Sequence, residues 1–253
     1  IVFPLIAGCV CFLINIGHYS RNYALSENIL GTEETESAKY FNAEMSPGLL
    51  LSNVVKNAGL QIGPYPINQA YDKAVIGLHE ALDIPLNTPA TNFERTTYHG
   101  SGDFPNDEDS AANPLHFWLI LFACFALCLL FVRRETKNTR YGLFLFSSFL
   151  LQILLFSYLL KWQPWKKRLH LPLFFIAIPL VEYVTSAKRS FLKRTYFMLP
   201  TFVFYGFLVI LFNFSRPFFW SNNKIAPVSV FDERSKKYFA KKPELYLEYQ
   251  QMK

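Results

Sequence analysis

Charged side chains are scarce in this chain. Asp, Glu, Lys and Arg make up 17% of its 253 residues, whereas 51% are hydrophobic and 17% are aromatic. This balance is too apolar for an ordinary soluble domain. Four runs are almost free of charge, at residues 113–132, 141–160, 169–186 and 195–214. Since a helix needs about 20 residues to cross the roughly 30 Å hydrocarbon layer, the sequence predicts a mainly α, polytopic membrane protein with four complete spanning helices.

A fifth apolar run opens the chain without an initiator methionine or a basic segment before it. This pattern indicates the end of a spanning helix rather than a signal peptide. We therefore expect a fragment with a partial transmembrane helix (1–16), a small helical extracytoplasmic domain (17–112), four transmembrane helices (113–214) and a basic extracytoplasmic tail (215–253).

Motifs of soluble enzymes are missing as well. The chain has no GxSxG, P-loop or Rossmann glycine pattern, which excludes the hydrolases and nucleotide-binding folds that depend on them. His79 and His99 have no nucleophile nearby in the sequence, so we interpret them as structural or surface groups. There is no CxxC pair, and the four cysteines lie within apolar runs, where they pack as small hydrophobic residues: Cys9, Cys11, Cys124 and Cys128.

One segment before the first complete apolar run is rich in carboxylates, with Asp103, Asp107, Glu108 and Asp109. Oxygen ligands at this density could hold a divalent cation, although the segment lacks the alternating ligands and central glycine of a calcium loop. A solvated acidic turn is the alternative. No cofactor and no metal centre are expected. Whether this segment binds a divalent cation is left as an open alternative.

The loop charges predict an orientation in the membrane. Residues 17–112 carry thirteen acidic and five basic side chains, whereas 133–140 carries four basic residues against one acidic. Because short basic loops stay cytoplasmic, 17–112 is expected outside and 133–140 inside. Counting crossings then places 161–168 outside, the basic segment 187–194 inside and the tail 215–253 outside. The loop 161–168 is basic and breaks the rule.

Two interpretations of this basic link remain open. Its two tryptophans and its cations could form an interfacial belt in which long side chains reach the lipid headgroups. Alternatively, the cations could bind an anion at the outer face, such as a lipid-linked phosphate. The residues concerned are Lys161, Trp162, Trp165, Lys166, Lys167 and Arg168, with His170 two positions further on.

The segment 17–112 is expected to contain two helices. The first has Ser46 as N-cap, Pro47 in its first turn and Gly59 at its end, with an apolar face of Leu50, Leu51, Val54 and Ala58. The second lies within 68–85, where Tyr71, Val75, Leu78 and Leu82 recur at helical spacing. We expect the two helices to pack on each other, because neither polar face is rich in Lys or Arg. Asn113 and Pro114 are the expected N-cap and first residue of the first complete span.

Glu182 is the one acidic residue within the four runs. It lies near the cytoplasmic end, so pairing with Lys188 or Arg189 is the expected role. No central ionisable residue marks a pathway through the spans, which disfavours a transporter.

Several segments resemble a known family: "GHYSRNYALSENILG", "SPGLLLSNVVKNAGLQIG", "DEDSAANPLHFWLI" and "LKWQPWKKRLHLPLF". They are similar to bacterial membrane glycosyltransferases of the GT-C class, related to protein O-mannosyltransferases and the lipid A aminoarabinose transferase. The resemblance implies an enzyme of the bacterial inner membrane that transfers a sugar from a polyprenyl-phosphate donor to an acceptor on the outer face. It assigns Lys166, Lys167, Arg168 and His170 to the departing lipid phosphate. The catalytic carboxylate is unknown, because its expected place in such enzymes is the first exterior loop, upstream of this chain.

A different class of function is the alternative. The contrast between the acidic segment 17–112 and the basic tail also fits a non-enzymatic membrane subunit that docks onto a larger complex. The expected partners are membrane lipid, a polyprenyl-phosphate sugar donor and, for the alternative, a protein complex. No nucleic-acid partner is expected.

Overall fold

The computed structural model describes residues 2–29, 38–63, 65–98, 112–133, 139–187, 189–211, 231–239 and 243–252. Throughout these residues the chain is mainly helical and contains no strand. The prediction that the fold is mainly α is confirmed.

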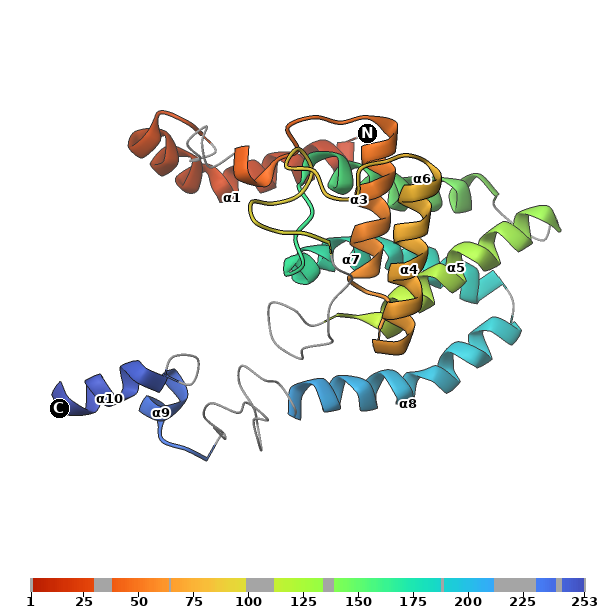
Figure 1. Ribbon diagram of the computed structural model, residues 1–253. Coiled ribbons are helices and arrows are strands. Elements are labelled where there is room, and N and C mark those ends of the chain that lie inside the picture. The colour runs from red at the N-terminus through yellow and green to blue at the C-terminus, as the bar shows by residue number, and fades with distance from the viewer. Residues whose placement is uncertain are drawn as a thin grey trace.

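The elements follow one another along the chain as a series of helices (Figure 1). Their bounds are α1 Val2–Ser26, α3 Pro47–Gly59, α4 Tyr65–Ala81, α5 Pro114–Val132, α6 Thr139–Leu159, the 3-10 helix η1 Lys166–His170, α7 Leu171–Ala187, α8 Arg189–Leu211, α9 Arg234–Tyr238 and α10 Pro243–Met252.

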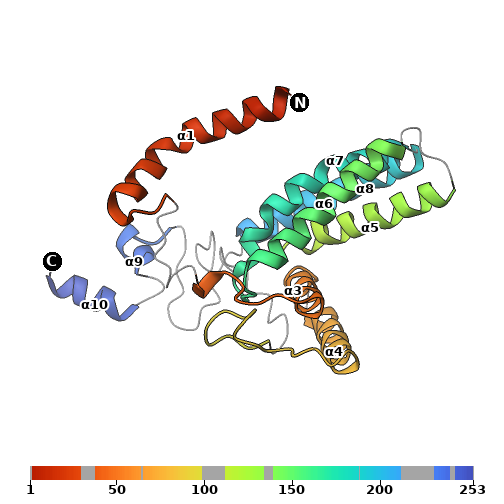
Figure 2. The same ribbon diagram turned by 90° about the horizontal axis from the view of Figure 1, so that it is seen from above.

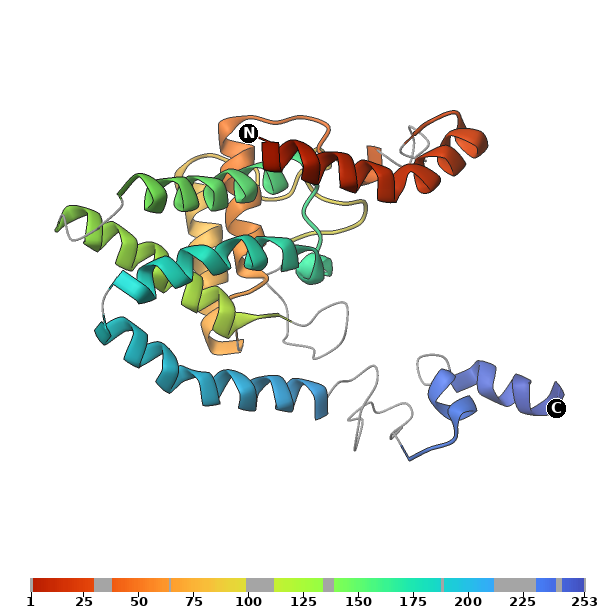
Figure 3. The ribbon, with the colours of Figure 1, turned by 180° about the vertical axis from the view of Figure 1, so that it is seen from behind.

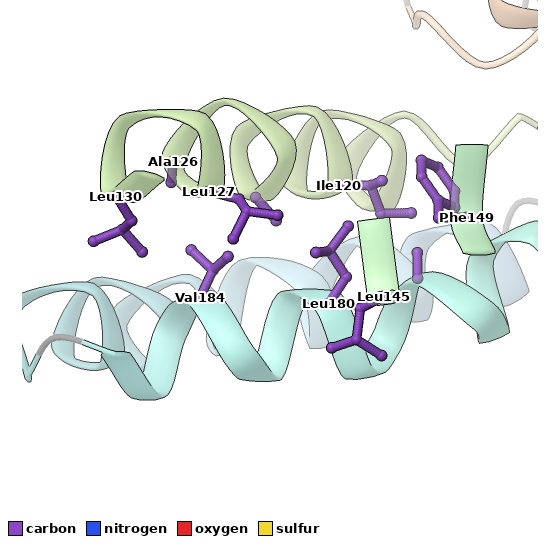
Figure 4. Close-up of a cluster of buried hydrophobic side chains, with 10 residues drawn as sticks. Ile120, Ala126, Leu127, Leu130, Leu145, Phe149, Leu180 and Val184 are labelled. Atoms are coloured by element: carbon purple, nitrogen blue, oxygen red, sulfur yellow. The ribbon is translucent and has the colours of Figure 1, made fainter. Parts of the chain in front are cut away.

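A bundle of apolar helices forms the centre of the structure. α7 packs against α5, α6 and α8. The core between α5, α6 and α7 is shown in Figure 4, and its fully buried side chains include Leu127, Leu180 and Val184. Small residues such as Ala123 and Ala177 lie in the same core and allow the helix backbones to approach closely, as in membrane bundles.

Three helices are long and apolar enough to span a membrane: Pro114–Val132, Thr139–Leu159 and Lys166–Ala187. They match three of the four predicted spans. The fourth differs, because the apolar part of α8 within the described residues is Met198–Leu211, shorter than a full crossing. Large apolar side chains such as Phe125 and Phe144 lie exposed on the outside of the bundle, where a membrane would cover them.

The two predicted helices of the segment 17–112 are present as α3 and α4. They lie side by side at one end of the bundle (Figure 2). α3 begins at Pro47, and the hydroxyl of Ser46 accepts a hydrogen bond from the main-chain N–H of Leu49 at 3.2 Å, so Ser46 is the predicted N-cap. The Tyr71 hydroxyl on α4 donates to the carbonyl oxygen of Val55 at 2.8 Å, which joins the two helices.

The remaining helices lie outside this packed region. α1 continues past the predicted boundary at residue 16 as far as Ser26, and Figure 2 shows it apart from α3, α4 and the bundle. Figure 3 shows α8 along one side of the bundle, with α9 and α10 beyond the end of α8.

Candidate functional site

The C-terminal end of α6 is capped by two asparagines from another part of the chain. The last carbonyl groups of a helix have no partner within the helix. The Asn42 side chain donates to the carbonyl oxygen of Tyr158 at 2.7 Å and to that of Ser157 at 3.1 Å, and its main-chain N–H donates to Leu159 at 3.0 Å. The Asn53 side chain donates to Ser157 at 3.1 Å. These bonds fix α3 and the segment before it to the end of α6.

The buried polar face of α3 meets α6 on one side and α4 with the segment 86–92 on the other. Its buried polar side chains recur at helical spacing, so they share one face; with Gln61 just beyond the helix, they are Ser52, Asn53, Lys56 and Asn57. This differs in part from the predicted apolar packing face, because Leu51 is 38% exposed, whereas Val54 and Ala58 do face the bundle and line a cavity there. The reason is that α3 covers a helix end and a link with free main-chain groups, which amide side chains satisfy and leucines do not.

The basic link after α6 is held by main-chain hydrogen bonds on both sides. The N–H of Lys161 donates to Tyr40 at 2.9 Å, and the N–H of Trp162 donates to Thr91 at 2.7 Å. The N–H of Phe93 donates in turn to Trp162 at 3.0 Å. The main chain of the link is therefore fixed to two other segments of the protein at Lys161 and Trp162.

The two tryptophans of the link have different environments. Trp162 is 1% exposed and belongs to a hydrophobic cluster with Leu60, Val75 and Tyr98. Trp165 is 45% exposed and makes an edge contact with Phe93. The interfacial-belt interpretation thus fails for Trp162, because the ring packs inside the protein.

The structure separates the four residues predicted to bind lipid phosphate. Lys166, Lys167 and His170 are buried, whereas Arg168 is exposed. The ammonium group of Lys166 donates to the carbonyl oxygen of Lys161 at 2.8 Å, within the link itself. Of the four, His170 lines a cavity between α3 and the bundle, and the other three are not part of its lining.

His170 is held by Gln61 at the end of α3. The side-chain amide of Gln61 lies 3.0 Å from Nδ1 of His170 and donates to the carbonyl oxygen of Lys167 at 3.2 Å. Its oxygen accepts the main-chain N–H of Asn113 at 2.7 Å. Asn113, the predicted N-cap of α5, makes no side-chain capping bond and is fixed through this N–H instead. Gln61 therefore joins α3, the start of α5 and η1.

A cavity of about 210 Å³ lies between α3 and the helices of the bundle. Its polar lining consists of Asn57, Gln61, Ser157 and His170, which form two hydrogen-bonded pairs, Asn57 with Ser157 and Gln61 with His170. The remainder of the lining is apolar and comes mostly from α5, α6 and α7: Val54, Ala58, Phe117, Ile120, Leu121, Phe149, Ile153, Phe156, Leu173 and Phe174. This combination suits the end of an apolar chain together with a polar head.

Lys56 lies on the same polar face of α3, away from the cavity lining. Its ammonium group donates to Asn92 at 2.7 Å and to the carbonyl oxygen of Leu86 at 3.2 Å, and it lies 5.8 Å from the centre of the Trp162 ring. Burial lowers the pKa of Lys56 to about 7, because the charged form loses its hydration. Lys56 therefore changes charge near neutral pH.

A second, larger cavity of about 480 Å³ lies on the other side of α5 and α7. Glu182, Thr185 and His116 line it among apolar side chains. Glu182 is exposed, and the side chains of its predicted partners Lys188 and Arg189 lie outside the described residues.

No cluster of metal-binding side chains occurs within the part of the chain that the structure describes. The acidic segment 103–109 and His99 fall outside that part. His79 is buried, with Nδ1 at 2.7 Å from the carbonyl oxygen of Val75 and Nε2 at 2.8 Å from the Ser52 hydroxyl, in agreement with a structural role. Cys9, Cys124 and Cys128 carry free thiols.

Comparison of the chain with protein-family models, with characterised protein sequences and with solved structures gives no match. The site must therefore be interpreted from its own chemistry.

Sequence reasoning missed Asn53, Asn57 and Gln61. A signal for them was present, because these amide side chains recur every four residues along and just past α3 and therefore share one face. Their partners lie about one hundred positions away in the sequence.

Proposed function

We propose that this chain is part of a membrane glycosyltransferase that takes a sugar from a polyprenyl-phosphate carrier. The observation that carries the proposal is the cavity beneath α3. Its apolar walls suit isoprene units, and its polar end offers neutral donors to the head of the carrier. The cations of η1, next to His170 in the chain, favour a negatively charged head.

The proposal includes a location in the membrane. The three long apolar helices and α8 would cross the bacterial inner membrane, with α3 and α4 on the outer side, as the loop charges predict. The cavity would then lie near the outer end of the bundle, where a lipid-linked sugar is presented.

A binding assay tests the proposal. We would titrate the detergent-purified chain with farnesyl phosphate and measure Kd by microscale thermophoresis. Leu121→Trp fills the cavity and should weaken binding about tenfold or more, whereas Leu151→Trp, on an exposed part of α6, should leave Kd unchanged. Equal binding by both variants, or no binding by the unaltered chain, contradicts the proposal.

The non-enzymatic subunit is the competing proposal, motivated by the charge contrast between 17–112 and 215–253. It requires a stoichiometric protein partner that copurifies in mild detergent. Purification of the chain alone, together with specific binding of farnesyl phosphate, favours the glycosyltransferase.

A further inference from the structure

The orientation of the Gln61 amide is determined by its neighbours. A main-chain N–H can only donate, so the Gln61 atom 2.7 Å from the Asn113 nitrogen is the oxygen Oε1. A carbonyl oxygen can only accept, so the atom 3.2 Å from the Lys167 oxygen is the nitrogen Nε2. Both contacts give the same orientation.

This orientation determines the protonation of His170. Nε2 of Gln61 carries two hydrogens, of which one is donated to Lys167 and the other points to Nδ1 of His170 at 3.0 Å. Nδ1 must therefore accept, and it carries no proton. In a neutral imidazole the single proton then lies on Nε2. A doubly protonated ring would bring two N–H groups against each other at Gln61.

The Nε2–H group of His170 has no acceptor among the residues that the structure describes. The side chain is 3% exposed, Nε2 makes no hydrogen bond, and the residue lines the cavity beneath α3. The ring of Phe156 meets the imidazole edge-on, with the ring centres 4.9 Å apart. A buried donor without an acceptor is costly, and an oxygen atom that reached Nε2 from the cavity, after a shift of the side chains that now cover this nitrogen, would remove that cost.

We infer that His170 is a neutral donor whose Nε2–H binds a phosphate oxygen of an isoprenoid phosphate in this cavity, with Gln61 as its positioning residue. This rests on the proposed function and changes the role expected for His170, from one member of a cationic cluster to an uncharged hydrogen-bond donor. Lys166 and Lys167 lie in the same 3-10 helix as His170 and favour an anionic oxygen over that of an alcohol.

Two substitutions separate the two ring nitrogens. In His170→Asn the side-chain oxygen replaces Nδ1 and still accepts from Gln61, but the donor at the Nε2 position is lost. In His170→Gln the amide nitrogen reaches the Nε2 position and keeps that donor. We expect His170→Asn to raise Kd for farnesyl phosphate about tenfold or more, and His170→Gln to stay within about threefold of the unaltered chain. Farnesol and inorganic phosphate serve as controls for the apolar chain and the anion, and both should bind more weakly than farnesyl phosphate.

Nitrogen-15 NMR of histidine-labelled protein in detergent tests the tautomer without altering the site, since His170→Asn identifies the His170 signals. The expected result is a protonated Nε2 and an unprotonated Nδ1, with the Nε2 signal shifting when farnesyl phosphate is added. Gln61→Glu should move the proton to Nδ1, because a carboxylate accepts where the amide donates.

The outcomes distinguish this inference from the proposed function. A protonated Nδ1 in the unaltered chain, or equal Kd values for His170→Asn and the unaltered chain, overturns the role of His170 and leaves the cavity as a lipid-phosphate site. Failure of the unaltered chain to bind farnesyl phosphate overturns both.

Discussion

At the scale of single residues, Lys56 is the most unusual group outside the cavity. It is completely buried, and both of its hydrogen-bond partners are neutral oxygens. A neutral amine has two hydrogens, enough for Leu86 and Asn92. The hydrogen bonds are therefore kept when the proton is lost, whereas the weak attraction to the Trp162 ring favours the charged form. Burial is the larger effect, and it lowers the pKa to about 7.

The protonation of Lys56 predicts how stability depends on pH. The unfolded amine binds its proton below about pH 10.5 and the folded one only below about 7. Between these values the unfolded chain holds more protons, so the free energy of unfolding rises with pH, by at most about 1.4 kcal/mol per pH unit. Burial raises the pKa of Tyr71 to about 12 and raises that of Tyr98, whose hydroxyl also donates to Asp72. Above about pH 10 these tyrosines keep their protons in the folded chain and lose them in the unfolded chain, so the free energy of unfolding should fall again.

Thermal unfolding in dodecyl maltoside from pH 7 to 10 measures this effect. Lys56→Met should reduce the rise of Tm with pH and leave the part due to Lys166, whose pKa burial lowers to about 8, whereas Lys73→Met, at an exposed position on α4, should leave the rise unchanged. An undiminished rise in Lys56→Met would contradict the role of Lys56.

At the scale of elements, the end of α6 depends on side chains supplied by a distant segment. Asn53→Ala leaves the carbonyl of Ser157 with one donor fewer in a buried place, and the cost should be about 1–3 kcal/mol. Amide hydrogen exchange at residues 160–163 should become faster, because α3 no longer holds the link. Glu80→Ala, on the exposed face of α4, is the control; equal exchange in both variants would show that Asn53 does not hold the junction.

The contact between α6 and α7 places a glycine against a tyrosine ring. A Cβ atom at Gly142 would lie 2.7 Å from the ring of Tyr183 on α7, whereas one at Gly206 on α8 would meet nothing within 4 Å. Gly142→Leu should therefore lower stability by about 1–3 kcal/mol, and Gly206→Leu should not. Thermal unfolding of both variants measures the difference, and Tyr183→Ala should restore part of the loss in Gly142→Leu. Equal loss at both positions would contradict this packing.

Individual elements could largely be predicted from the sequence, but their contacts could not. Ser46, Pro47 and Gly59 determine where α3 begins and ends through local capping and backbone conformation, which depend on neighbouring residues alone. The face that α3 buries depends on its partner, a helix end reached only through the fold. Gln61 and His170 are 109 positions apart, and no local pattern predicts that they meet.

At the scale of the whole molecule, the loop charges and the contacts in the fold both indicate on which side of the membrane the link 161–168 is expected. The charges of the other loops and the count of crossings predict that the link faces outward, although the link itself is basic, and the contacts join it to the segment 38–98, which the same rule places outside. If the bundle crosses a membrane, the link and this segment lie on the same side of it.

Cysteine labelling in intact cells checks this arrangement. In a chain whose native cysteines are replaced by alanine, Arg168→Cys should react with a membrane-impermeant maleimide, because Arg168 is exposed and expected outside. Lys137→Cys should react only after lysis. The reverse pattern would place the link in the cytoplasm and exclude a donor site at the outer face.

The most direct test of the central claim is photo-crosslinking of the purified chain with a diazirine analogue of farnesyl phosphate, followed by mapping of the labelled peptides. If the cavity beneath α3 binds the lipid phosphate, label will concentrate on Phe117–Leu121 and Phe149–Ile153 and will be displaced by excess farnesyl phosphate but not by farnesol. Label spread over the outer face of the bundle, at Phe125 and Phe144, and insensitive to competitor would contradict the account.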